Sequence, residues 1–442
     1  MFGQIFGAVL RLSSSLVMTR LLVPEVFGIV ALAGVIHVIV TLLSDIGLRQ
    51  AVIQSPRGHT PTMLHTAWAL QAIRGVSIWV ICSAIAAGLY FARGAGLIDM
   101  DSVYAAPELP AVVIISTLGA IVLGFQSTKS MIADRNLDQR RIVLIEVVSQ
   151  LVGVAVMVAC AWWFRSVWSI VAGGLVSAVV TVTLSHVWLD GLRDRLGWDR
   201  DAAKELLGYG RWVLASSILY VISTNADRLL LGAWVSAATL GIYALALNLA
   251  TLLEILGARL FSSVAMPALS EVARSDRERF RHVYFRLRLP FDLIFLAAAG
   301  FVFAVGQLVV DILYDPRYSQ AGEMLQVLSF LLVFSRYGLA GSAYLALGVP
   351  RNLTIIHVVK LVAVVLLIPV GYWLGDVEGA IWGIALHAGV SLPVTFYLNH
   401  KLGLNNMRFE LGVLAAWPVG WLIGLLVVLG AGYLPLEFLI DR

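Results

Sequence analysis

Repeated runs of about 20 apolar residues constrain this chain more than any other feature, because each run can cross the hydrocarbon core of a membrane as an α-helix. Of its 442 residues, 60% are hydrophobic and 13% are charged, about half the charge of a typical soluble protein. Strands that span a membrane need only about 9–11 alternating residues, so runs of this length exclude a β-barrel. We therefore predict an all-α polytopic membrane protein. About thirteen candidate spans cover residues 2–22, 27–43, 63–91, 110–130, 141–164, 167–189, 209–234, 239–266, 289–313, 324–347, 353–374, 380–398 and 411–433.

Positive charge alternates from one connection to the next. Arg and Lys are concentrated in every second connection, with six arginines between residues 274 and 288, whereas the other connections hold few cations and several acids. Cytoplasmic loops carry an excess of Lys and Arg, so this pattern places the N-terminus in the cytoplasm. The first 22 residues have no basic start and no small-residue cleavage site, so we interpret them as a retained span.

Two parts of the sequence resemble each other at an offset of six predicted spans. Residues 19–22 and 27–33 match residues 227–230 and 240–246. An even number of spans per repeat gives both halves the same orientation, so we expect two six-helix bundles related by a pseudo-two-fold axis along the membrane normal. The expected parts are an N-terminal bundle at 1–189, a cytoplasmic amphipathic helix as linker at 190–206, a C-terminal bundle at 207–402, and an extra transmembrane helix with a tail at 403–442.

The same segments carry motifs of a known family. The patterns T-R-L-L-x-P-x-x-F-G at 19–28 and N-A-D-R-L-L-L-G at 225–232, followed by L-G-I-Y at 240–243, resemble the Wzx-type polysaccharide flippases of the multidrug/oligosaccharidyl-lipid/polysaccharide exporter superfamily. The resemblance covers nearly the whole chain. It implies transport of undecaprenyl-diphosphate-linked oligosaccharide repeat units across the bacterial inner membrane for polysaccharide biosynthesis. It also implies contact with membrane lipids and work beside a polysaccharide polymerase and other assembly proteins.

Several cations fall well inside the predicted spans. A charged group at mid-membrane costs about 2.5–3.5 kcal/mol on insertion scales, so such residues usually face the interior of a bundle or a hydrated cavity. Arginine and lysine bind phosphate oxygens well, which suits a diphosphate cargo. The alternative for Arg11 and Arg74 is pairing with an acid such as Asp45, whereas Arg336 and Lys360 have fewer obvious acidic partners. The predicted substrate-binding cations are Arg11, Arg74, Arg336, Lys360 and Lys129.

A second set of ionisable residues is a candidate for ion coupling or gating. Histidine titrates near neutral pH, as proton coupling requires, although a histidine in a span is more often a hydrogen-bond donor between helices. Asp227 also has a structural interpretation, because it can face a partner helix and set the packing of the two halves. The candidates are Asp292, Glu254, Asp227, His357 and His387.

Motifs for catalysis, cofactors and metals are missing from the sequence. It contains no Walker A sequence, H-E-x-x-H or G-x-S-x-G, so we expect no enzyme activity, no cofactor and no metal site. The arginines at 274–288 lie in a predicted cytoplasmic loop beside anionic lipid, so we expect no nucleic-acid partner. Two alternatives to a flippase stay open. A drug or cation exporter of the same superfamily would favour acids in its cavity, and a membrane-embedded sugar polymerase would need a long outer loop.

Overall fold

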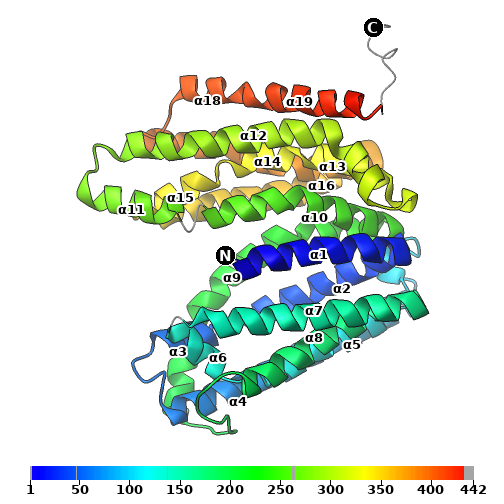
Figure 1. Cartoon of the computed structure of the whole chain (residues 1–442), viewed down its shortest axis with the longest axis vertical. Helices are drawn as coiled ribbons and strands as arrows, with labels where there is room; N and C mark the ends of the chain where they lie inside the picture. Colours follow the sequence, from blue (N-terminus) through cyan, green and yellow to red (C-terminus); the bar gives the residue numbers. More distant parts are fainter. Residues whose placement is uncertain (1, 46, 137, 261–263, 433–442) are drawn as a thin grey trace. The chain divides into compact units, whose positions relative to one another are not determined.

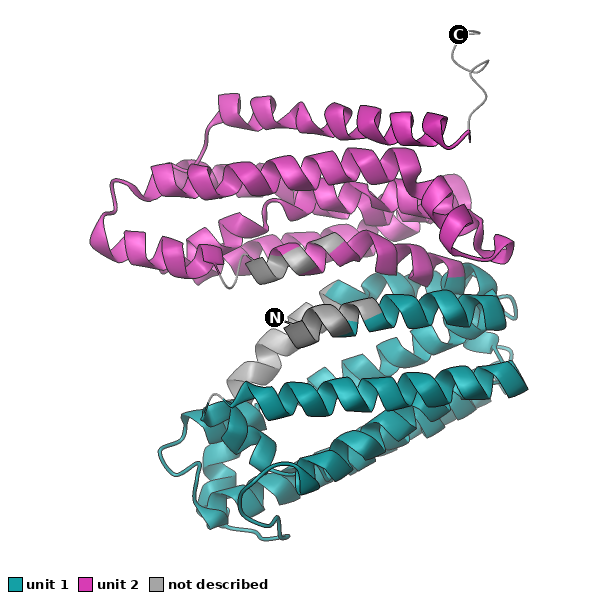
Figure 2. Cartoon of the chain, viewed as in Figure 1, with its two compact units in different colours: residues 1–241 teal, residues 242–442 magenta. Residues whose placement is uncertain are grey.

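The computed structural model describes residues 2–45, 47–136, 138–260 and 264–432, and all of the regular structure among them is helical. The chain forms two compact units, Met1–Gly241 and Ile242–Arg442 (Figure 2). The first unit holds α1 (Phe2–Leu21), α2 (Pro24–Leu43), α3 (Leu48–Gln54), α4 (Pro61–Gly94), α5 (Leu109–Gly124), α6 (Lys129–Arg135), α7 (Gln139–Phe164), α8 (Trp168–Val187), α9 (Arg200–Trp234) and the start of α10 (Ala237–Leu260) (Figure 1). The second unit continues with α11 (Met266–Ser275), α12 (Phe280–Leu313), α13 (Gln320–Leu328), α14 (Phe330–Ser335), α15 (Gly338–Ala346), α16 (Pro350–Leu386), α17 (Leu392–Lys401), α18 (Met407–Leu414) and α19 (Ala416–Gly430). Short 3-10 helices lie at Val103–Ala105, Pro316–Tyr318 and His387–Ser391.

These helices confirm the prediction of an all-α polytopic membrane protein. Among the described residues, eight helices are long and apolar enough to cross a membrane, or nine if the bent pair α5 and α6 forms one span. One of them, 52 residues from Pro350 to Lys401, is more than twice the length that a single span needs. It breaks at Gly375 and Asp376, where the backbone leaves the helical region, so it covers two predicted spans. The total of thirteen stays a prediction.

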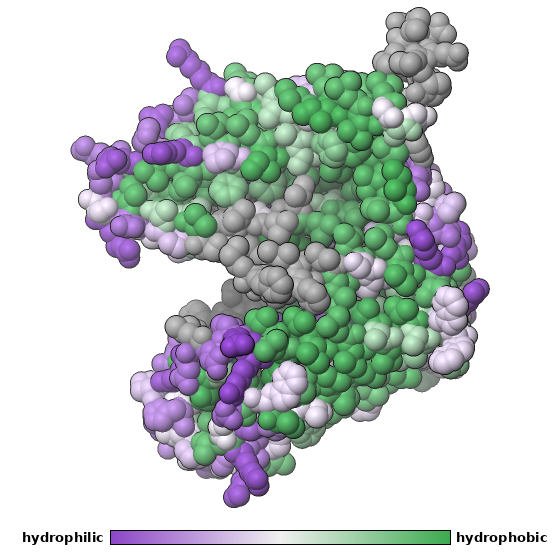
Figure 3. All heavy atoms as spheres, in the orientation of Figure 1, coloured by the Kyte–Doolittle hydropathy of each residue, from purple (hydrophilic) through white to green (hydrophobic). Residues whose placement is uncertain are grey.

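The surface of each unit is divided into hydrophobic and hydrophilic regions, as expected for a membrane protein. Figure 3 shows hydrophobic side chains over the middle of the helices and hydrophilic side chains gathered over α3 and α6 in the first unit and over α11 in the second. Large apolar side chains such as Trp373 and Leu426 are exposed. Apolar surface of this extent is covered by lipid in a membrane protein.

Glycines bring neighbouring helices into close contact. In the first unit, a Cβ on Gly153 of α7 would lie 2.9 Å from the carbonyl oxygen of Gly173 on α8, and a Cβ on Gly173 would lie 2.7 Å from that of Gly153. In the second unit, Gly420 of α19 lies against the backbone of α12 at Ala297. Small residues permit this approach where no hydrophobic effect drives helices together in lipid.

A reciprocal contact joins the two copies of the predicted repeat within the first unit. A Cβ on Gly28 of α2 would lie 1.9 Å from the carbonyl oxygen of Ala237, and a Cβ on Gly241 of α10 would lie 2.0 Å from that of Pro24. The predicted repeat aligns Gly28 with Gly241, and the same offset aligns Pro24 with Ala237. Exchange of equivalent residues is the pattern that a two-fold axis produces. It supports the repeat locally, while the symmetry of the whole bundles stays a prediction.

The linker differs from its prediction. Residues 190–199 are not helical, and only Arg200 onward forms a helix, as the first turn of α9. The reason is that the aspartates of this segment bind elsewhere in the first unit. Asp199 caps α9 by accepting a hydrogen bond from the backbone N–H of Ala202, and its own N–H donates to Thr66. The prediction of an amphipathic helix at 190–199 is therefore wrong, while the other predicted domain boundaries stay predictions.

Replacing Gly28 by alanine tests the crossing of α2 and α10. The new Cβ meets a backbone oxygen that cannot move alone, so we expect a loss of about 1–3 kcal/mol of stability. Thermal unfolding of the purified protein in detergent measures it. Gly34→Ala is the matched control, because Gly34 lies on the same helix with open space beside it. Equal melting temperatures for both variants would contradict the contact.

Candidate functional site

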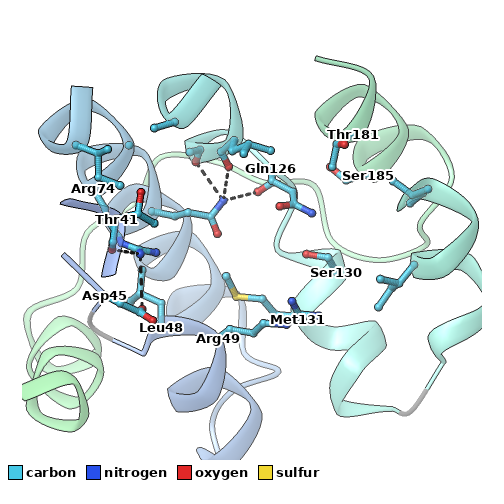
Figure 4. Close-up of a pocket in the computed structure, with 18 of the residues that line it drawn as sticks. Thr41, Asp45, Leu48, Arg49, Arg74, Gln126, Ser130, Met131, Thr181 and Ser185 are labelled. Atoms are coloured by element: carbon cyan, nitrogen blue, oxygen red, sulfur yellow. Dashed lines mark hydrogen bonds and ion pairs between the residues drawn. The ribbon is translucent and has the colours of Figure 1, made fainter. Parts of the chain in front are cut away.

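The first unit contains a polar cavity of about 490 Å³ that is lined by residues of α2 to α8 (Figure 4). Apolar side chains such as Ile78 and Ile145 form part of its wall. A polar cavity inside an apolar bundle is where a membrane protein holds a polar ligand. Its polar lining residues are His37, Thr41, Asp45, Arg49, Gln50, Gln71, Arg74, Gln126, Ser130, Glu146, Thr181 and Ser185.

Arg74 lies in this wall and holds the end of α2. Its Nη2 donates to the carbonyl oxygen of Thr41 at 2.8 Å, its Nε lies 3.3 Å from Ser44 Oγ, and its Nη2 is 3.7 Å from a carboxylate oxygen of Asp45. The last carbonyl groups of a helix lack partners within it, so an arginine at this point satisfies them. The side chain remains about a quarter exposed, at 24%. The alternative interpretation, an ion pair with Asp45, is therefore observed, and Arg74 also lines the cavity, as its prediction as a substrate-binding residue requires.

The second feature of the cavity is the bend between α5 and α6, where the chain turns by 66°. The amide nitrogen of Gln71 on α4 shares its two protons among the carbonyl oxygens of Leu123, Gly124 and Gln126, at 3.2, 3.2 and 3.0 Å. Non-helical backbone at membrane depth is stable only where other groups satisfy it. The break therefore depends on Gln71.

The linker also binds the turn between α5 and α6. Asp194 accepts hydrogen bonds from Ser127 Oγ at 2.6 Å and from the backbone N–H of Thr128 at 3.0 Å, and its side chain is 2% exposed. Nearby, Arg141 at the start of α7 donates to the exposed carboxylate of Asp190, which lowers the pKa of that group. The linker is thus part of the first unit at this end of the cavity.

The other predicted cations of the first unit lie outside the cavity wall. Lys129 Nζ donates to the carbonyl oxygen of His186 at the end of α8, 2.9 Å away. Arg11 is exposed on α1. Of the three predicted cations in this unit, the structure places Arg74 in the wall. The wall also contains Arg49, which is paired with Asp134.

In the second unit, Arg336 belongs to a buried cluster of two arginines and two acids. Asp292 lies 2.9 Å from Arg288 and 3.1 Å from Arg336, and Glu410 lies 2.5 Å from Arg288 and 3.1 Å from Arg336. All four side chains are at most 8% exposed. Tyr337 donates to Glu410 at 3.0 Å.

This cluster corrects two expectations. The sequence offers Arg336 few obvious acidic partners, but the structure gives it two, so it does not present a free charge to a cavity. The sequence also places Arg288 in a cytoplasmic loop, but α12 begins at Phe280 and buries it. Asp292, a candidate for ion coupling, is held in the same cluster. Both partners of Arg336 lie far from it in the sequence, Asp292 on α12 and Glu410 on α18, so only the packing of these helices reveals them.

The remaining candidates are spread over both units. On α16, Lys360 interacts electrostatically with Glu254 of α10, and it lines a small cavity of about 80 Å³ with His357. His387 Nδ1 lies 2.5 Å from the carbonyl oxygen of Ile384 in its own helix end. Asp227 is buried on α9. Among the described residues, no group of three or more His, Cys, Asp or Glu side chains is arranged to hold a metal ion.

Two residues of the cavity were missed from the sequence. Glu146 is the only acid in the predicted span at 141–164. A single acid in an apolar run is a feature from which a cavity residue can be predicted. Gln71 carries no charge, so a search for charges at membrane depth passes over it. Its role depends on the bend between α5 and α6. The sequence does not reveal this bend, because the apolar run at 110–130 continues through it.

Comparison with known proteins gives one family and one fold. Residues 17–323 match the family described as polysaccharide biosynthesis protein. The chain is 24% identical over 314 residues to the lipopolysaccharide biosynthesis protein WzxC of Escherichia coli (strain K12), covering 71% of this chain and 61% of WzxC. It is 25% identical over 254 residues to the amylovoran biosynthesis protein AmsL of Erwinia amylovora, covering 55% of this chain and 64% of AmsL. The chain thus spans less than two thirds of the length of these relatives.

Solved structures show the same fold at low identity. The lipid II flippase MurJ in an inward closed conformation has a TM-score of 0.70 and 12% identity, with 99% of this chain and 93% of that chain covered. At this identity the likeness concerns the fold alone. It agrees with the all-helical architecture seen here.

Replacing Glu410 by glutamine tests the buried cluster. The change leaves two arginines with one carboxylate, and removing one partner of a buried ion pair costs about 3–5 kcal/mol. We expect a clear fall in melting temperature in detergent. Glu278→Gln serves as the control, since Glu278 is exposed on the same unit. If both variants unfold at the wild-type temperature, the four charged side chains do not form the buried cluster described above.

Proposed function

Because the chain belongs to the polysaccharide biosynthesis protein family, we propose that it is a flippase that moves undecaprenyl-diphosphate-linked oligosaccharide repeat units across the bacterial inner membrane. The family match confirms the resemblance to Wzx-type flippases on which the sequence prediction rests. The observation that carries the proposal is the polar cavity around Arg74, which lies within the matched residues.

The cavity has the chemistry that such a cargo needs. A diphosphate and its sugars lose their water when they enter a bundle, and polar groups have to replace it. The guanidinium of Arg74 can bind phosphate oxygens. Two hydrogen bonds occupy two of its N–H donors, while a guanidinium has five. The apolar lipid tail can stay outside among the helices.

Transport requires no covalent step, so the proposal assigns no enzymatic role to the chain. We place the N-terminus in the cytoplasm from the distribution of Lys and Arg. An ion gradient or the membrane potential would drive the movement, with Glu254, Asp227, His357 and His387 as the coupling residues. Arg11, Lys129 and Lys360 stay proposed contacts for the cargo. A polysaccharide polymerase would receive it on the outer side.

A drug or cation exporter is the second candidate, and one observation favours it. The cavity wall holds two acids, Asp45 and Glu146, beside two arginines, so its charge is balanced rather than cationic as expected. Asp45 is close to Arg74, which reduces its attraction for a cationic drug. A transport assay with both kinds of cargo separates the two functions.

Replacing Arg74 by alanine tests the proposed function. In vesicles that contain a fluorescent undecaprenyl-diphosphate-linked sugar, we expect the flipping rate to fall at least tenfold, because a charge-assisted hydrogen bond contributes about 1.5–3 kcal/mol. Arg93→Ala is the control, since Arg93 lies in the last turn of α4 outside the cavity. Unchanged flipping by a folded Arg74→Ala protein would remove Arg74 from the substrate site. Transport of a cationic drug but not of the lipid-linked sugar would reverse the order of the two candidates.

A further inference from the structure

Glu146 is a carboxylate in the cavity wall. It lies on α7, its side chain is exposed, and it lines the cavity. Among the residues that the structure describes, it accepts no hydrogen bond and no cation lies within 4 Å of it. A charge within a predicted span is costly unless water or a ligand solvates it. The structure therefore leaves its acceptor oxygens for whatever enters the cavity.

The hydroxyl group of Thr181 on α8 adds a further acceptor to this wall. Its Oγ1 donates its proton to the carbonyl oxygen of Ser177 at 2.9 Å, and a hydroxyl that has donated its single proton can only accept further hydrogen bonds. Ser185 Oγ donates to the carbonyl oxygen of Val182 at 2.7 Å and already accepts from the backbone N–H of Ser127 at 3.0 Å, so it is occupied within the unit. Ionised Glu146 is acceptor-only. Glu146 and Thr181 therefore favour a ligand group that donates protons.

The cavity separates Thr181 from Arg74. Figure 4 shows Arg74 with Thr41 and Asp45 on one side of the cavity, and Thr181 and Ser185 on the other. A diphosphate has acceptor oxygens and negative charge, so it is attracted to Arg74 and repelled by Glu146. Sugar hydroxyl groups can donate to a carboxylate without any charge of their own. A cargo that joins a phosphate to a sugar matches both sides.

We propose that Glu146, together with Thr181, binds hydroxyl groups of the sugar that adjoins the diphosphate, so that the cavity recognises the sugar as well as the phosphate. This inference rests on the proposed function and assigns specificity within it. Arg74 binds the anion, and Glu146 distinguishes a lipid diphosphate that carries a sugar from one that does not. The empty carrier lipid would bind less tightly and would not be moved in place of the loaded one.

Binding of two probes to the purified protein tests the inference. The probes are undecaprenyl diphosphate and undecaprenyl diphosphate that carries one glucose. We expect the wild-type protein to bind the glucose probe about tenfold more tightly, since hydrogen bonds to a charged group have that effect. Glu146→Ala should remove this preference, and its affinity for undecaprenyl diphosphate should be no lower than that of the wild type, because a repelling charge is lost. Arg74→Ala should weaken the binding of both probes.

Two further variants control the experiment. Asp138→Ala removes an exposed acid at the N-terminal cap of α7 that makes no side-chain capping bond and lies outside the cavity, and it should bind both probes as the wild type does. Glu146→Gln keeps one acceptor oxygen and should retain part of the preference. Thermal unfolding establishes that each variant is folded.

The outcomes separate the inference from the proposed function. If the wild type binds both probes equally, or if Glu146→Ala keeps the full preference for glucose, the sugar contact is wrong while the flippase proposal stands. If the wild type binds neither probe, both proposals fail. Loss of the preference in Glu146→Ala alone supports the inference.

Discussion

Polar groups inside a lipid-embedded bundle have no bulk water to bind, so each needs a partner within the protein. This requirement accounts for the features of the chain that are not simple apolar packing. Arg288 and Arg336 are surrounded by two carboxylates, and the carbonyl groups at the break after α5 are bound by Gln71. Glu146 is a carboxylate of the cavity wall to which the described part of the chain offers no cation and no hydrogen-bond donor.

Close glycine packing occurs both outside the cavity and at its wall in the first unit. At Gly153 and Gly173, outside the cavity lining, the backbones of α7 and α8 are in contact. At the wall, a Cβ on Gly75 of α4 would lie 2.4 Å from the carbonyl oxygen of Ala120 on α5. The cavity lies where α5 stops short and turns. A straight continuation of α5 would fill the interior with a helix. The break thus creates both the space for a ligand and the backbone groups that have to be satisfied around it.

Much of the architecture could be predicted from the sequence because apolar run length and lipid thickness are directly related. The cavity could be predicted only in part. Arg74 was found because its charge contrasts with an apolar run, whereas the partners of Arg336 were not, because Glu410 lies 74 positions away and only the packing of α18 on α12 brings them together. The irregular linker was missed because its spacing of apolar residues suits a helix. The path of the linker depends on the contacts of Asp194 and Asp199, which cannot be predicted from the spacing of apolar residues.

The contacts of Asp194 make the linker an integral part of the first unit rather than a passive tether. Its carboxylate is bound to the turn between α5 and α6, and the chain enters α9 only six residues later. Asp199, five residues after Asp194, is held in turn by Thr66 on α4 and by the first turn of α9. The segment between the two aspartates is therefore fixed at both ends, so its length sets how the start of α9 lies relative to the turn beside the cavity.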